Sequence, residues 1–253
     1  MHDMIEESGR LLPWDACYNV RDVGGYDTVD GRRTRWGALL RADNLCRLTR
    51  DGQAALVAHG VRTIIDLRSP SELALEPHPF AEPAGHRGAP VYLSLSLLDE
   101  EDADAQAALA ETDTTTAFYC RALDLFPAKI GAAITAVAEA PEGGVLVHCF
   151  AGKDRTGLVT AVLLELAGVP RETIAVDYAL SDTYLQPLYN ELLAPIEDAV
   201  EREKLAQQFT SLPKTLLDTL AHLDARYGGV RSYLEVCGVG AKDMERIKDR
   251  LCV

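Results

Sequence analysis

Short apolar runs alternate with amphipathic stretches along the first two-thirds of the chain. The run "VRTIID" (61–66) is rich in β-branched and apolar side chains, and it predicts a buried strand that stops at Asp66. The same reasoning predicts two further strands and two helices, in "APVYLSL" (89–95), "GGVLVHC" (143–149), "TAFYCRALDLF" (116–126) and "PAKIGAAITAVAEA" (127–140). Strands that alternate with helices favour an α/β fold with a central, mostly parallel sheet flanked by helices.

Cap and turn residues mark the ends of several elements. Thr49 is suited to N-cap a helix over "DGQAALVAHG", and Gly60 stands just past the end of that helix. Ser69 and Glu72 form a capping box, which predicts a helix over "SPSELALE". The pair Asp30-Gly31 predicts a hairpin turn between two partly alternating runs.

The C-terminal part of the chain (171–253) is predicted to be helical throughout. Apolar residues recur at helical spacing in "SLPKTLLDTLAHLDARYGG" (211–229) and "AKDMERIKDRL" (241–251). No linker rich in Pro, Gly or Ser interrupts the chain, so we expect one domain over 1–253. The acidic stretch 97–116 has few large apolar side chains and predicts a surface loop or a mobile excursion.

The charge balance narrows the classes of partner. The net charge of −14 over 253 residues argues against a surface for nucleic acid or for anionic membranes. Several basic residues nevertheless stand in or near the segments that carry candidate chemistry: Arg32, Arg33, Arg35, Arg41, Lys153 and Arg155. An acidic chain with a local basic pocket suits a small anionic ligand.

The N-terminal sequence and the spacing of the cysteines indicate the cellular compartment and the state of the thiols. The start "MHDMIEESGR" has neither a basic n-region nor an apolar h-region, and no apolar run reaches the roughly 18 residues of a membrane helix. We expect a cytoplasmic protein without stable membrane insertion, and export without a signal peptide stays open. The six cysteines are scattered and form no CxxC pair, so we expect free thiols, no metal site and no cofactor. The oligomeric state is left open.

The stretch "HCFAGKDRTG" (148–157) joins the last predicted strand to a buried helix. Cys149 stands at the carboxyl end of the strand, where ligands bind in open α/β sheets. Gly152 lets the backbone approach a ligand closely, and the N–H groups of the loop and of the helix N-terminus form an anion cradle of phosphate size. Arg155 offers a planar fork that matches two phosphate oxygens. The same positive field favours the thiolate of Cys149, so the C-x5-R spacing predicts phosphate binding and an activated nucleophile.

This stretch resembles the signature of the cysteine-dependent protein tyrosine phosphatase superfamily. More narrowly, it is similar to a bacterial group marked by HCxxGKDRTG, which includes secreted mycobacterial phosphatases of phosphoproteins and phosphoinositides. Four other stretches are similar to that group: "YNVRDVGGY" (18–26), "LLRADNLCRLT" (39–49), "IIDLRS" (64–69) and "YGGVRSYLEVCGV" (227–239). The resemblance spans nearly the whole chain. It implies a tyrosine-phosphatase-type fold with the active site at the carboxyl edge of the sheet.

The resemblance also implies a role for each residue of the loop. Cys149 would be the nucleophile and Arg155 the phosphate clamp, while Thr156 stands where the family has a hydroxyl that aids breakdown of a phosphocysteine. His148 tends to order the loop in the family. A lysine at the place of Lys153 resembles phosphatases that act on inositol lipids, where it adds a second cation. The implied substrate-binding residues are Phe150, Ala151, Gly152, Lys153 and Thr156.

The leaving oxygen needs a proton, so a carboxylic acid must lie within reach of it. Asp154 lies inside the loop, at a place where myotubularin-like and Sac-like lipid phosphatases carry an aspartate that looks like the acid. Asp66 ends a buried strand and could face the same crevice, although it could instead pair structurally with Arg68. Asp113 and Asp124 stand near the distance at which other tyrosine phosphatases place their acid, but no WPD triplet surrounds them.

We therefore expect a protein tyrosine phosphatase that works through a phosphocysteine intermediate. Phosphotyrosine is the expected substrate, and phosphoserine, phosphothreonine and phosphoinositides are left open. The alternative is a phosphate-recognition module without turnover, although such pseudophosphatases usually lack the cysteine or the arginine. The amphipathic segment 184–213 matches no motif of the group. It is either a lid over the pocket or an element packed plainly against the core.

Overall fold

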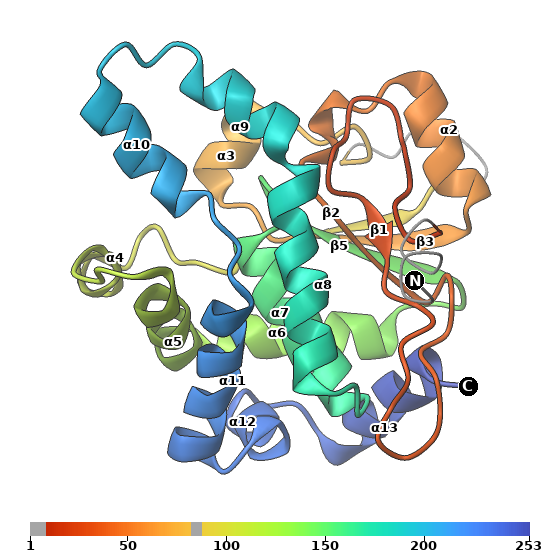
Figure 1. The fold of residues 1–253 in the computed structure, drawn as a ribbon. Helices are drawn as coiled ribbons and strands as arrows, with labels where there is room; N and C mark the ends of the chain where they lie inside the picture. The colour runs from red at the N-terminus through yellow and green to blue at the C-terminus, as the bar shows by residue number, and fades with distance from the viewer. Residues whose placement is uncertain (1–8, 82–87) are drawn as a thin grey trace, which may run out of the picture.

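One sheet of five strands lies at the centre of the computed structural model, which describes residues 9–81 and 88–253 (Figure 1). The order across the sheet is β1 (Arg21–Asp22), β2 (Leu39–Ala42), β5 (Gly144–His148), β3 (Val61–Asp66) and β4 (Val91–Ser94). β1 pairs antiparallel with β2, and the other neighbouring strands are parallel. The mostly parallel sheet of the sequence prediction is confirmed.

The register brings the carboxyl ends of four strands to one edge of the sheet. His148 pairs with Ala42 of β2 on one side and with Asp66 of β3 on the other. Asp66 pairs in turn with Ser94 of β4. The residue that follows β5, Cys149, therefore leaves the sheet between the ends of β2 and β3, at the edge where α/β sheets bind ligands.

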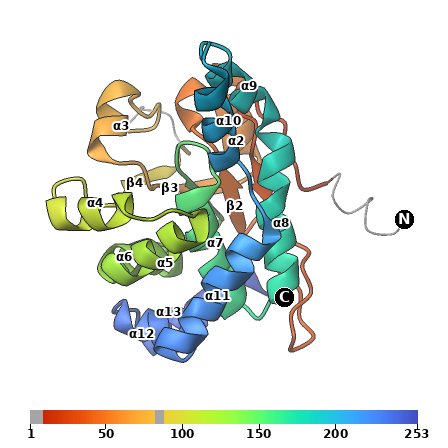
Figure 2. The same cartoon turned by 60° about the vertical axis from the view of Figure 1, so that its left-hand side comes forward.

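Helices cover both faces of the sheet (Figures 1 and 2). They are α2 (Arg50–Ala58), α3 (Pro70–Leu75), α4 (Ala103–Ala110), α5 (Thr115–Leu125), α6 (Pro127–Glu139), α7 (Asp154–Leu166), α8 (Arg171–Tyr184), α9 (Gln186–Leu193), α10 (Ala199–Gln208), α11 (Pro213–Tyr227), α12 (Val230–Val236) and α13 (Ala241–Leu251). A 3-10 turn, η1 (Leu45–Arg47), precedes α2. The expected α/β fold is thus present.

The alternation of side chains within the strands separates two apolar layers. Leu39 and Val147 point into the larger layer, which is formed with α5, α6, α7 and α11 to α13. Leu40 and Leu146 point to the opposite face, where they pack with Trp14 and α2. Nearly all of α7 is buried in the larger layer. The loop that opens α7 is therefore held between a central strand and a central helix.

The predicted helix signals are confirmed. Thr49 N-caps α2 and accepts from the N–H of Gly52, and both hydrogen bonds of the Ser69–Glu72 capping box are present at the start of α3. Asp30-Gly31 lies in a turn whose two sides pair through an antiparallel bridge between residues 27 and 33. The segment from 171 onward is helical, as predicted.

The prediction of a surface loop over 97–116 is wrong. Residues 103–110 form α4, which Asp102 N-caps by accepting from the N–H of Ala105. Ala105 and Leu109 are buried against the larger apolar layer. Two small or medium apolar side chains at helical spacing were therefore enough to hold this acidic segment, because a partner surface was available.

The helices α9 and α10 pack beside the loop that follows β5. Leu185, Leu188 and Tyr189 form a small apolar cluster with Ala151 of the loop and with Phe209, which follows α10. The rings of Tyr189 and Phe209 stack with their centroids 4.4 Å apart. Figure 1 shows this helical pair at the upper left, above the end of α8.

Candidate active site

The loop after β5 turns its carbonyl groups outward. Three successive carbonyls, those of Phe150, Ala151 and Gly152, accept hydrogen bonds from the N–H of Asn44 (2.8 Å), the side-chain amide of Asn19 (3.0 Å) and the guanidinium of Arg41 (2.7 Å). The C=O and N–H of one trans peptide unit point in opposite directions. The N–H groups of the residues that follow these carbonyls therefore point toward the inner side of the loop.

Arg41 reaches the loop because Asp177 of α8 holds its guanidinium. Arg41 Nη1 lies 2.8 Å from Asp177 Oδ2, and Arg21 Nε lies 3.0 Å from Oδ1 of the same carboxylate. All three side chains are buried. Burial alone would raise the pKa of Asp177, but the charges of Arg21 and Arg41 lower it to about 2. The carboxylate thus stays ionised and ties β1, β2 and α8 to the loop.

Gly152 is required by its backbone conformation and by its neighbour. Its φ is +66°, in the left-handed region that favours glycine. A Cβ at this position would lie 2.3 Å from the carbonyl oxygen of Ala42. The loop could not hold this shape with any larger residue.

Glu72 fixes the guanidinium of Arg155 in the first turn of α7. Nη2 donates to Oε1 at 2.7 Å and Nη1 donates to Oε2, so the contact is bidentate. Burial alone would lower the pKa of Arg155, but the hydrogen bond to Glu72 and then the charge of Cys149 raise it above its usual range. The predicted clamp residue is therefore held, fully charged, near the predicted nucleophile.

Cys149 and Thr156 are both buried in this arrangement. Cys149 is 2% exposed and is a free thiol. The hydroxyl of Thr156 is buried without a hydrogen-bond partner among the described residues. A buried polar group without a partner is destabilising, so its presence in the loop calls for a physical explanation.

Asp66 is locked into ion pairs and hydrogen bonds. Its Oδ2 lies 2.7 Å from Arg68 Nη2, 3.4 Å from His148 Nε2 and 3.0 Å from the hydroxyl of Tyr92, which donates to it. Burial alone would raise the pKa of Asp66, but His148 and then Arg68 lower it well below its usual range. Asp66 therefore stays a carboxylate that orients the residue before Cys149, which does not suit a proton donor.

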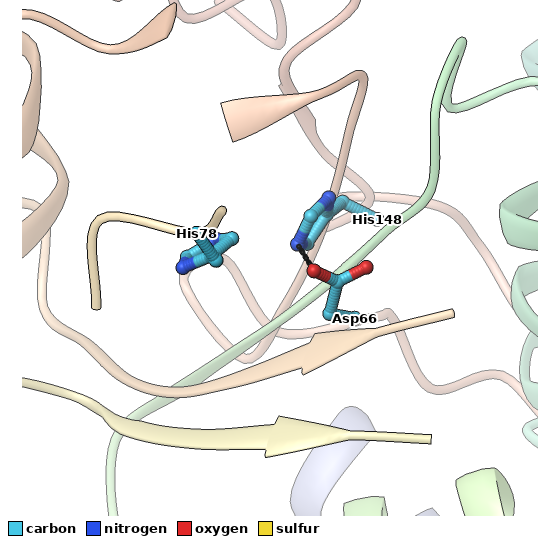
Figure 3. A group of neighbouring side chains, drawn as sticks. All are labelled: Asp66, His78 and His148. Atoms are coloured by element: carbon cyan, nitrogen blue, oxygen red, sulfur yellow. Dashed lines mark ion pairs between the residues drawn. The ribbon is translucent and has the colours of Figure 1, made fainter. Parts of the chain in front are cut away.

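His78 completes a buried group with Asp66 and His148 (Figure 3), whose potential ligand atoms lie within 4.8 Å of one another. The hydrogen bonds do not suit a metal ion. The N–H of Phe80 donates to Nδ1 of His78 (3.1 Å), so the neutral ring carries its proton on Nε2 and offers no free lone pair. Burial lowers the pKa of His78 to about 3, which keeps the ring neutral. The Arg68 guanidinium already neutralises Asp66.

Asp154 is the first residue of α7, directly before Arg155. The hydroxyl of Tyr119 donates to its Oδ1 at 2.5 Å, and Lys153 Nζ lies 3.2 Å from the same oxygen. Asp154 also lines a cavity of about 550 Å³ together with Asp113 and residues of α5 and α10, whereas Cys149 and Arg155 are not among its lining residues. The carboxylate of Asp124 instead accepts a hydrogen bond from the hydroxyl of Tyr227 (2.7 Å) and lies 2.9 Å from Nε2 of His222. Asp154 is therefore the carboxyl that combines a place on the loop with access to a cavity.

Lys153 is almost fully buried and does not extend into solvent. Its Nζ donates to the carbonyls of Gln208 (3.0 Å) and Thr210 (3.3 Å), which lie at the end of α10 and just after it. The loop is thus hydrogen-bonded directly to the segment at the end of α10.

Comparison with known proteins agrees with this geometry. The sequence model of the tyrosine phosphatase family matches residues 12–253, nearly the whole chain. The chain belongs to the tyrosine phosphatase family. A tyrosine-protein phosphatase of Nostoc commune is 32% identical over 229 residues, covering 85% of this chain and 74% of the relative. The triple specificity protein phosphatase PtpB of Mycobacterium tuberculosis is 28% identical over 274 residues, covering 94% and 97%. The protein is thus a phosphatase that acts on phosphorylated substrates, and an enzyme rather than a recognition module.

None of the phosphatase's described helices combines the length and hydropathy needed to cross a membrane.

Some of the site was not visible in the sequence. Glu72 was predicted only as a capping residue, and its hold on Arg155 depends on how α3 lies against α7. Not all of the basic residues expected near the loop lie there. Arg32 pairs with Asp30 in the distant turn, and Arg35 donates to the carbonyl of Cys252.

Replacing Gly152 should lower the activity by changing the shape of the loop, and not only by lowering the stability of the fold. Gly152→Ala should lower kcat by about 100-fold, because the methyl group meets the Ala42 carbonyl and displaces the cradle. Gly31→Ala is the matched control: its φ is +83° but nothing lies within 4 Å. It should lose only about 1 to 2 kcal/mol of stability and keep its activity. Steady-state kinetics and thermal unfolding of both variants would test this, and equal activities would contradict the argument.

Proposed function

We propose that this phosphatase hydrolyses phosphomonoesters through a phosphocysteine formed on Cys149. The observation that carries the proposal is the outward orientation of the loop carbonyls, because it leaves inward N–H groups to bind phosphoryl oxygens. Arg155, held by Glu72, supplies a charged bidentate donor to the same group. These fixed dipoles and charges stabilise the negative charge of the transition state.

The first step transfers the phosphoryl group to sulfur. The thiolate of Cys149 attacks phosphorus, the S–P bond forms and the bond to the leaving oxygen breaks. Asp154 gives its proton to that oxygen, so the alcohol or phenol leaves neutral.

The second step returns the enzyme to its starting state. Water attacks the phosphorus of the phosphocysteine, and the carboxylate of Asp154 takes one proton from that water molecule. A new O–P bond forms, the S–P bond breaks, and inorganic phosphate and the thiolate are released. We assign the unpartnered hydroxyl of Thr156 to the departing sulfur, which it stabilises by a hydrogen bond.

We propose phosphotyrosine as the main substrate, with phosphoserine, phosphothreonine and phosphoinositides as further substrates. The name of the relative from M. tuberculosis, a triple specificity phosphatase, supports a broad range. Lys153 places a second cation on the loop. Once its ammonium group leaves the carbonyls of Gln208 and Thr210, it can bind a second phosphate group of a phosphoinositide. Release of phosphate from peptides carrying each phosphorylated residue, and from short-chain phosphoinositides, tests the range. Turnover of phosphotyrosine alone would restrict it.

Cys149→Ser should abolish turnover but keep phosphate binding, because the cradle remains. We expect kcat to fall at least about 1,000-fold. Titration calorimetry with inorganic phosphate should still detect binding. Cys120→Ser, which changes a half-buried thiol on α5, is the control and should keep full activity. Substantial turnover by Cys149→Ser would reject the phosphocysteine mechanism.

The two candidate acids should differ in their dependence on the leaving group. Asp154→Asn should lower kcat by about 100-fold for aryl phosphates with poor leaving groups and much less for p-nitrophenyl phosphate. Asp66→Asn should instead give a similar loss for every leaving group, because it disorders His148 and the loop. A plot of log kcat against the acidity of the leaving phenol separates the two. The reverse pattern would move the acid to Asp66.

We also propose that residues 184–213 form a lid over the site. Lys153 bonds to the carbonyls that follow α10, and the apolar cluster of α9 packs on Ala151. Cys149, two residues before Ala151, is almost fully buried. Closure would shield the thiolate from solvent and oxidants, since accessible thiolates are readily oxidised.

Loosening the lid should expose the thiolate to peroxide. Phe209→Ala removes the stack on Tyr189 and should raise the rate of inactivation by hydrogen peroxide several-fold. Val200→Ala, an exposed position of α10, is the control and should leave the rate unchanged. Dithiothreitol should restore activity, and bound phosphate should protect. An unchanged rate in a folded Phe209→Ala variant would reject the lid.

A further inference from the structure

Two buried tyrosines lie in a chain behind Asp154. Tyr119 comes from α5 and Tyr178 from α8, and both are fully buried. Their hydroxyl oxygens lie 2.8 Å apart, and the Tyr119 hydroxyl donates to Asp154 Oδ1 at 2.5 Å. A phenol has a single proton to donate, and that of Tyr119 goes to Asp154. The direction of the chain is therefore fixed: Tyr178 donates to Tyr119, and Tyr119 donates to Asp154.

The surroundings keep both hydroxyls in place as donors. The two rings meet edge to face at an angle of 85° with their centroids 6.2 Å apart. The ring of Tyr178 also packs on the first turn of α7, where it lies 3.2 Å from the position that a Cβ of Gly157 would take. Burial, and then the nearby charge of Asp154, raises the pKa of both phenols above the usual range. Both hydroxyls therefore stay protonated at neutral pH.

The two oxygens of Asp154 differ in their environment. Tyr119 and Lys153 both approach Oδ1, whereas no described residue donates to Oδ2. A protonated carboxyl whose Oδ1 already accepts two donors carries its proton on the other oxygen. The side chain is 37% exposed, so this second oxygen is not enclosed by the core.

We propose that Tyr119, supported by Tyr178, is a positioning residue that occupies Oδ1 of Asp154 and thereby presents the transferable proton on Oδ2 to the leaving group. This inference rests on the proposed role of Asp154 as the acid. It assigns a function to two residues outside the signature loop, on two helices that are distant from it in the sequence.

The inference predicts a specific kinetic defect in Tyr119→Phe. The ring and its packing remain, but the carboxyl loses the donor that orients it. We expect kcat for phenyl phosphate to fall about tenfold, with less than about a twofold change for p-nitrophenyl phosphate, whose leaving group needs little protonation. KM should stay the same for both substrates. Tyr178→Phe should give a smaller defect of the same kind, because it removes only the donor that polarises Tyr119.

Two comparisons keep a structural defect apart from a positioning one. Tyr233→Phe is the matched control: it removes another fully buried hydroxyl, which donates to the Leu123 carbonyl (3.0 Å) away from the loop. It should leave the leaving-group dependence unchanged. In an Asp154→Asn background, Tyr119→Phe should have no further effect on that dependence, because the group it positions is gone.

The outcomes distinguish this inference from the proposed function. If Asp154→Asn itself shows no dependence on the leaving group, the acid role fails and the inference fails with it. If Asp154→Asn shows that dependence but Tyr119→Phe and Tyr178→Phe lose activity equally on both substrates, or lose none, the acid role stands and the positioning role is overturned. A further loss from Tyr119→Phe in the Asp154→Asn background would also overturn it.

Discussion

The outward orientation of three loop carbonyls is the constraint on which this active site depends. Peptide geometry links it to the inward N–H groups, so a loop that lost its outer partners would also lose its phosphate cradle. A buried carbonyl without a donor costs about 1 to 3 kcal/mol. The donors are Asn19, Arg41 and Asn44, which lie before β1, in β2 and just after β2. The N-terminal part of the fold is thus organised around a loop that comes much later in the chain.

The charge beneath the loop is opposite to that of the chain as a whole. The net charge is −14, yet Arg21 and Arg41 are buried together against the single carboxylate of Asp177. Buried charges persist only where partners and hydrogen bonds compensate for lost hydration. Here the second partner of Arg41 is the carbonyl of Gly152. The same guanidinium therefore shapes the loop and adds positive charge beneath the proposed phosphate site.

Two carboxylates near the site show how environment assigns different tasks to one chemical group. Asp66 is enclosed by Arg68, Tyr92 and His148, which favour its ionised form and keep it as a fixed anchor. Asp154 accepts a hydrogen bond at one oxygen, and its partly exposed side chain lines a cavity. The sequence offered both as candidate acids, and only their surroundings separate them.

Local patterns in the sequence predicted most of the elements and the candidate residues of the loop. The strand before Cys149, the glycine at 152, the arginine at 155 and the buried helix after them are local patterns. Local patterns are readable because hydrogen bonds and periodicity act over a few residues. The capping box at Ser69 and Glu72 was readable for the same reason.

The contacts that these side chains make with distant segments follow from the tertiary structure alone. Glu72 holds Arg155 because the fold brings the start of α3 within side-chain reach of the start of α7, and Tyr119 reaches Asp154 from α5. The helix over 103–110 formed because its two apolar side chains found a surface to cover. Such contacts join segments far apart in the chain, and their strength depends on burial and on partners that no local pattern specifies.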